Sequence, residues 1–107
     1  MPPEHVIAAL GALAQEHRLA VFRLLVQTGP DGLAAGALAE AAGVSASSMS
    51  FHLAQLNQAR LIAQRREGRS IIYSANYSAM TALLEYLTEN CCAGAACSVP
   101  AVATAGC

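Results

Sequence analysis

The chain has 107 residues, an apolar fraction of 55% and a net charge of −1. This length fits one domain with a modest core, and two Phe, three Tyr and no Trp make that core largely aliphatic. The uncharged stretch 90–107 lacks the bulky apolar residues of a membrane span, and the N-terminus resembles no signal peptide. We therefore expect a cytoplasmic protein with no membrane partner.

Apolar residues at helical spacing predict two helices in the first third of the chain, over residues 4–15 and 16–27. A break rich in Gly and Pro at residues 28–32 ends the second helix. A short third helix is expected over residues 34–42. Ser45 is a good N-cap and predicts the start of a fourth helix.

The period of the pattern then changes. Residues 61–66 and 70–74 are short and β-rich, and a glycine-containing turn joins them, which predicts a two-stranded hairpin. A last helix is expected over about 77–92. We therefore divide the chain into a folded domain, 1–92, and a cysteine-bearing tail, 93–107.

The order of these elements, ααααββα, is that of a winged helix-turn-helix. The fold class is therefore predicted to be mainly α with a small β-hairpin. The third and fourth helices would form the DNA-reading pair, and the hairpin would form the wing.

The fourth helix has two different faces. Met49, Leu53 and Leu56 share one face, which we expect to be buried. The opposite face is rich in hydroxyls and carries Phe51. Hydroxyls can donate to phosphate, a helix N-terminus favours anions, and Phe51 could contact a thymine methyl. The alternative is that the serines only cap the helix and Phe51 packs locally. We expect His52, at the edge of the buried face, to be packed and hydrogen-bonded.

The segment 45–75 is basic in an otherwise acidic chain, with four arginines against one glutamate. Its arginines fit a wing that binds phosphate, although strand-end solubility would also explain them. The predicted DNA-binding residues are Ser47, Ser48, Ser50, Phe51, Gln55, Arg65, Arg66 and Arg69.

Three segments and one tyrosine resemble the ArsR/SmtB family of homodimeric winged-helix repressors, which sense metals and metalloids. They are LAQEHRL at 13–19, VSASSMSFHL at 44–53, RREGR at 65–69, and Tyr73. The resemblance covers roughly residues 5–90. It implies a homodimer that binds an inverted-repeat operator in double-stranded DNA, with contacts at Ser47, Ser50 and Phe51. The position of Ala46 is often polar in that family, so no base contact is expected there.

All four cysteines lie in the last seventeen residues, at Cys91, Cys92, Cys97 and Cys107. A reducing compartment favours metal or redox chemistry over structural disulfides. Three thiolates suit soft trivalent arsenic. Neighbouring side chains diverge by about 100° on a helix, so Cys91 and Cys92 converge only if the helix frays, which Gly94 would permit. We expect Cys91, Cys92 and Cys97 to bind As(III), with Cys107 as a spare.

The resemblance also bears on the ligand. Some arsenic sensors of the family carry Cys-x-Cys at the third helix, but residues 33–37 contain no sulfur. Zinc sensors use Asp and His pairs on the last helix, which here has Glu85 and Glu89 but no His. The cysteine pattern resembles a subgroup of arsenic-responsive repressors with Cys-Cys-x(n)-Cys after the last helix.

The leading hypothesis is a metalloid-responsive repressor that dissociates from its operator when As(III), Sb(III) or methylarsenite binds. The alternatives are a thiol redox switch, a cadmium or zinc sensor that uses all four thiols, and a metal-binding module that does not bind DNA. We expect no catalytic cofactor and no enzyme, because no base or oxyanion partner accompanies the cysteines.

Overall fold

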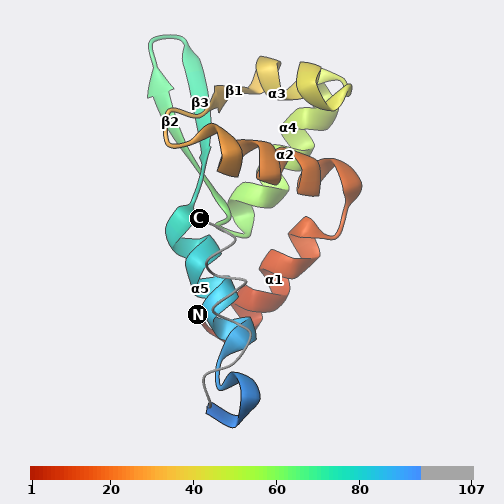
Figure 1. The fold of residues 1–107 in the computed structure, drawn as a ribbon. Helices are drawn as coiled ribbons and strands as arrows, with labels where there is room; N and C mark the ends of the chain where they lie inside the picture. Colours follow the sequence, from red (N-terminus) through yellow and green to blue (C-terminus); the bar gives the residue numbers. More distant parts are fainter. Residues whose placement is uncertain (95–107) are drawn as a thin grey trace.

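The computed structural model describes residues 1–94, and Figure 1 shows their helices with a small sheet at one side. In this part of the chain the elements are α1 (Pro3–Leu13), α2 (Glu16–Thr28), β1 (Leu33–Ala34), α3 (Ala35–Ala42), α4 (Ala46–Gln58), β2 (Ile62–Glu67), β3 (Ser70–Ala75), α5 (Tyr77–Thr88) and the 3-10 turn η1 (Cys91–Gly94). The predicted winged helix-turn-helix is confirmed, and its helices and hairpin lie within a few residues of their expected positions.

Two features differ from the sequence-based expectation. The pattern does not predict β1, because a two-residue strand is too short to show alternation. The last helix ends at Thr88 rather than near 92, because Glu89 is extended and Asn90 has a positive φ of 56°. The expected domain boundary after residue 92 stays a prediction, since residues 95–107 lie outside the described part.

Side-chain caps fix the start of three helices. Gln15 Oε1 accepts from the Arg18 amide at the start of α2, at 2.9 Å. Ser45 Oγ accepts from the Ser48 amide at the start of α4, at 3.1 Å, and Asn76 caps α5 in the same way. Each cap satisfies an amide that would otherwise lack an intrahelical acceptor.

The three strands form an antiparallel sheet in the order β1-β3-β2. β2 and β3 extend from the helices as the wing (Figure 1). Gly32, just before β1, has a φ of 71°, and a Cβ there would clash with the carbonyl oxygen of Tyr73. The loop that precedes β1 is therefore packed directly against β3, which only glycine allows at this position.

The core lies between the helices and the base of the wing. Its largest fully buried side chains come from α2, α3, α4 and the residue before β2: Val21, Leu25, Leu38, Met49, Leu53, Leu56 and Leu61. Burying such side chains contributes about 1.5–3 kcal/mol each before entropy is counted. This core fixes α4 against α2 and α3, and so sets which face of α4 stays exposed.

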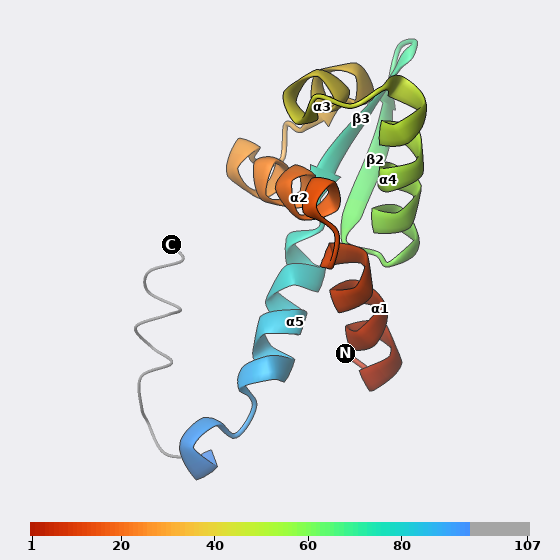
Figure 2. The same ribbon diagram turned by 90° about the vertical axis from the view of Figure 1, so that its right-hand side faces the viewer.

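α1 and α5 pack against each other at the end of the molecule opposite the wing (Figure 2). Three apolar residues there are mostly exposed: Ile7 at 70%, Leu84 at 53% and Leu87 at 54%. These two helices therefore carry an apolar face that this chain alone does not cover. None of the helices in the described part is long and apolar enough to cross a membrane.

Candidate functional site

α4 presents the two faces that its sequence predicts. Met49, Leu53 and Leu56 are buried, whereas Phe51 is 57% exposed. The predicted DNA-binding serines, Ser47, Ser48 and Ser50, are exposed as well. Because Ser45 caps the helix and its Oγ lies only 3.2 Å from that of Ser47, the hydroxyls cluster at a helix N-terminus, where an anion is favoured.

Gln55 and Ser50 lie on different flanks of α4. Gln55 lines a hollow of about 390 Å³ that is shared with α1. Ser50 lines a hollow of about 200 Å³ between α4 and the wing. The structure therefore groups Ser50 with the wing and places Gln55 beside α1.

The hollow between α4 and the wing contains polar residues that the sequence pattern did not assign to DNA. Besides Ser50, it is lined by Asn57, Gln64 and Tyr73. Gln64 and Tyr73 are cross-strand partners in the wing. The hairpin register pairs these two residues directly across the strands. A sequence-based register for the hairpin could therefore have placed both on one face of the wing.

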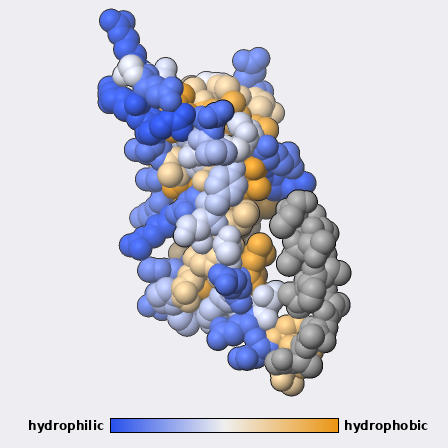
Figure 3. All heavy atoms as spheres, turned by 60° about the vertical axis from the view of Figure 1, so that its left-hand side comes forward, coloured by the Kyte–Doolittle hydropathy of each residue, from blue (hydrophilic) through white to orange (hydrophobic). Residues whose placement is uncertain are grey.

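The three wing arginines have different surroundings. All three are exposed, and Figure 3 shows hydrophilic residues gathered on the projecting wing at the upper left. Arg65, however, donates to Glu67, Pro30 and Asp31. Within residues 1–94, no acceptor holds Arg66 or Arg69. The freely available positive charge on the wing therefore comes from Arg66 and Arg69.

His52 is buried, as expected, and packs at the corner between α1 and α2. Arg18 Nη1 lies 3.4 Å from His52 Nδ1, and the His17 ring lies 5.6 Å from that of His52. Burial, followed by the nearby Arg18 and His17 charges, lowers the pKa of His52 from its usual 6.5. Arg18 Nε also donates to the Ala12 carbonyl at 2.7 Å. His52 therefore joins α4 to the α1–α2 corner.

The Sγ atoms of Cys91 and Cys92 lie 3.6 Å apart, just beyond α5. Neighbouring side chains on a regular helix would diverge, but Cys92 has a φ of 56° and Ala93 a φ of 57°. The helix therefore ends before the pair and a left-handed turn brings the two sulfurs together. Cys97 and Cys107 lie outside the described residues.

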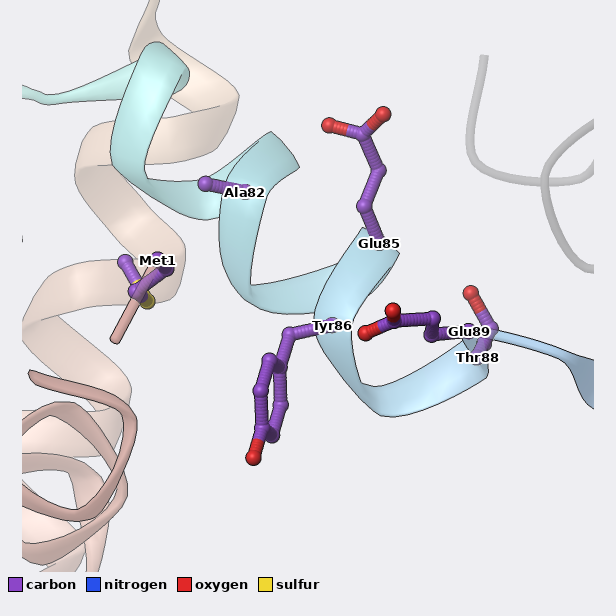
Figure 4. Close-up of a pocket in the computed structure, with 6 residues that line it drawn as sticks. All are labelled: Met1, Ala82, Glu85, Tyr86, Thr88 and Glu89. Atoms are coloured by element: carbon purple, nitrogen blue, oxygen red, sulfur yellow. The ribbon is translucent and has the colours of Figure 1, made fainter. Parts of the chain in front are cut away.

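A larger hollow, of about 660 Å³, lies between Met1 and α5 (Figure 4). Glu85 and Glu89 line it, but their carboxylates point in different directions in this view. Among residues 1–94 no three His, Cys, Asp or Glu side chains are grouped to hold a metal ion. Within the described residues, Glu85 and Glu89 are therefore not part of such a group.

Comparison with known proteins identifies the family. Residues 13–65 match the helix-turn-helix domain family. The nodulation protein NolR of Rhizobium meliloti is 36% identical over 95 residues, which cover 83% of this chain and 75% of NolR. The chain belongs to the ArsR family of winged-helix transcriptional regulators. As an ArsR-family protein it is a DNA-binding transcriptional regulator and not an enzyme.

Two solved structures of similar proteins share the fold. One is a homodimeric winged helix-turn-helix DNA-binding domain from Mycobacterium bovis, with a TM-score of 0.65 and 30% identity over 81% of each chain. The other is described as a possible transcriptional regulator for arsenical resistance. It has a TM-score of 0.65 and 28% identity, and the match covers 77% of this chain and 81% of that one.

Proposed function

We propose that this ArsR-family protein is a homodimeric repressor that leaves its operator when As(III), Sb(III) or methylarsenite binds Cys91, Cys92 and Cys97. The observation that carries this proposal is the 3.6 Å separation of the Cys91 and Cys92 sulfurs. Zn²⁺ bound about 2.3 Å from two thiolates at tetrahedral angles would hold them about 3.8 Å apart, and thiolates around a soft trivalent ion must likewise lie close together. The turn after α5 therefore brings two sulfurs to a spacing that suits one thiophilic ion.

The DNA would be bound by the exposed face of α4 and by the wing. Ser47, Ser48 and Ser50 would donate to phosphates at the start of α4, and Phe51 would meet a base edge in the major groove. Gln55 would reach the DNA only from its flank beside α1. Arg66 and Arg69 supply the free positive charge of the wing, and Arg65 lies beside them.

The apolar face of α1 and α5 would be covered by a second copy of the chain. Exposed Ile7, Leu84 and Leu87 are an unfavourable surface for a monomer. In a dimer with two-fold symmetry, each of these residues contributes to the interface from both subunits. The similar domain from Mycobacterium bovis is a homodimer, which supports this arrangement. A dimer would present two copies of α4 to an inverted-repeat operator.

The cysteine turn follows the helix that would form the dimer interface. Binding of an ion there would alter the end of α5 and, through the interface, the spacing of the two α4 helices. A coupling free energy of about 1–3 kcal/mol is enough to change operator occupancy. The similar protein described as a possible regulator for arsenical resistance supports a metalloid as the signal.

A thiol redox switch is the second candidate function. Two sulfurs 3.6 Å apart are also close enough for thiol–disulfide exchange after a small rotation. Cadmium or zinc bound by four thiolates would likewise need both cysteines. The same experiment separates these candidates.

The test is release of operator DNA, selected from a pool of random duplexes, by As(III), Sb(III), methylarsenite, Cd(II), Zn(II) and peroxide in separate titrations. We expect release at the lowest dose with a trivalent arsenical or antimonial. Cys91→Ser, Cys92→Ser and Cys97→Ser should bind DNA but no longer release it. Cys107→Ser is the matched control and should respond like the wild type.

Two results would contradict the proposal, one for the signal and one for the third ligand. Release by peroxide alone would favour the redox switch. Release that needs Cys107 but not Cys97 would mean that the third sulfur has been assigned wrongly.

A further inference from the structure

The guanidinium group of Arg65 is held at each of its three nitrogens by an acceptor on this chain. Nε donates to Oε2 of Glu67 at 2.7 Å, and the two side chains form an ion pair. Nη1 donates to the carbonyl oxygen of Pro30 at 3.1 Å, and Nη2 donates to that of Asp31 at 2.7 Å. The planar guanidinium group of Arg65 therefore donates to acceptors within the protein from all three nitrogens.

These contacts join two parts of the fold that are far apart in sequence. Pro30 and Asp31 belong to the loop that connects α2 to β1, 35 and 34 residues before Arg65. In the sheet, β3 lies between β1 and β2. The Arg65 side chain therefore links the outer strand of the wing to a loop on the other side of the central strand.

The α2–β1 loop is itself packed closely against the sheet. Gly32 packs so closely on β3 that a Cβ would meet the Tyr73 carbonyl, and its amide donates to the Gly29 carbonyl at 3.1 Å. The loop leads directly through β1 into α3, which packs on α4. The hydrogen bonds from Arg65 to this loop therefore link the position of the wing to that of α4.

The charge of Arg65 is also largely compensated. Glu67 accepts from it directly, so the pair adds little to the field that a phosphate would meet. Arg66 and Arg69 have no such compensation in the described residues. The wing therefore contains one arginine used for structure and two available for an anion.

We propose that Arg65 is a positioning residue for DNA binding. It holds the wing against the α2–β1 loop so that Arg66 and Arg69 meet the phosphates together. The inference rests on the proposed DNA contacts of the wing and is independent of the inducer. A wing already held in its binding geometry loses less conformational freedom when DNA binds.

The test compares Arg65→Lys and Arg65→Gln with Arg66→Lys and Arg66→Gln. Lysine keeps the charge but cannot reproduce a planar three-way contact. Affinity for labelled mixed-sequence duplex DNA is measured over a range of salt concentrations, because phosphate contacts set the slope of log affinity against log salt. Hydrogen exchange of the wing and loop amides is measured in the free protein, and urea unfolding checks that each variant is folded.

The expected results for the two positions are opposite. Arg65→Lys should weaken binding about three- to tenfold, leave the salt slope unchanged and speed amide exchange in β2 and in residues 29–32. Arg66→Lys should bind nearly like the wild type, and Arg66→Gln should reduce the salt slope by about 1. Neither Arg66 variant should change amide exchange in the loop.

Arg65→Lys with wild-type affinity and wild-type exchange would overturn the proposal. So would an Arg65→Gln variant whose salt slope falls by about 1, because that result assigns Arg65 to phosphate. A wild-type protein that binds no duplex at any salt concentration would instead refute the proposed function of the wing.

Discussion

The hydroxyl of Tyr77, at the first residue of α5, donates to the carbonyl oxygen of Val26 in the last turn of α2, at 3.0 Å. The Leu25 carbonyl lies 3.4 Å from the same hydroxyl. Carbonyls in the last turn of a helix lack intrahelical partners. Tyr77 therefore completes the end of α2 and ties the proposed dimer helix to the helix that leads into the α2–β1 loop.

Replacing Tyr77 with Phe should lower the free energy of unfolding by about 0.5–1.5 kcal/mol, because it removes one hydrogen bond to a part-buried carbonyl. Urea unfolding measures the change. Tyr86→Phe is the matched control, since Tyr86 lies on the same helix with an exposed side chain and should alter stability little. Equal effects of the two variants would show that the Tyr77 contact contributes nothing.

Two glycines with positive φ provide a matched pair. Gly68 at the wing tip has a φ of 61° and open space where an alanine methyl group would stand, whereas at Gly32 the methyl group would meet the Tyr73 backbone. Gly68→Ala should cost about 1–2 kcal/mol from backbone strain alone. Gly32→Ala should cost about 1–3 kcal/mol more, because the loop must move away from β3. Similar thermal midpoints for the two variants would contradict the close packing of this loop.

Leu84→Arg should separate the proposed dimer. The dimer interface would then bury two unpaired guanidinium groups. This burial should cost several kcal/mol and raise the dimer dissociation constant at least about a hundredfold. Sedimentation velocity measures the association state. Leu19→Arg is the control, because Leu19 is 45% exposed on α2, outside the α1–α5 face. A dimeric Leu84→Arg protein would refute the assigned interface.

Stability should fall as the pH drops below about 6.5. The pKa of His52 is lowered in the folded state, so the unfolded chain takes up a proton first and is stabilised relative to the folded one. The loss of stability begins as the pH falls through the pKa of His52 in the unfolded chain. It stops growing once the pH lies below the pKa of His52 in the folded protein. Protonation would also turn Nδ1 from an acceptor into a donor facing the Arg18 cation.

Urea midpoints at pH 7.5 and pH 5 would measure this effect. His52→Gln should lose less stability between these two pH values than the wild type does. His5→Gln is the matched control, because it removes a histidine outside the His17–His52 contact. An unchanged pH dependence in His52→Gln would assign the acid sensitivity to other groups.

The helices and the hairpin could be predicted from the sequence because each repeats a local pattern. Met49, Leu53 and Leu56 lie on one face of α4 at helical spacing, and this spacing alone identifies the face that packs inward. The exposed position of Phe51 follows from the same wheel. Local caps such as Ser45 also depend only on neighbouring residues.

The remaining features depend on partners that no local pattern reveals. β1 is a strand only because Leu33 and Ala34 pair with β3, some forty residues later. The end of α5 depends on the left-handed conformations of Asn90 and Cys92, and only Gly94 hinted at a stop there. The acceptors of Arg65 are backbone atoms of a distant loop, so its side chain looks like an ordinary wing arginine in the sequence.

That use of backbone atoms has a consequence for how the wing can evolve. The carbonyl oxygens of residues 30 and 31 are present whatever side chains stand there, so the loop can change sequence without losing its contact with Arg65. Aligned relatives would then show an arginine with no covarying residue, and an alanine scan of the loop would find positions 30 and 31 tolerant. A change in loop length, by contrast, would move the acceptors away, so the constraint falls on insertions and deletions rather than on substitutions.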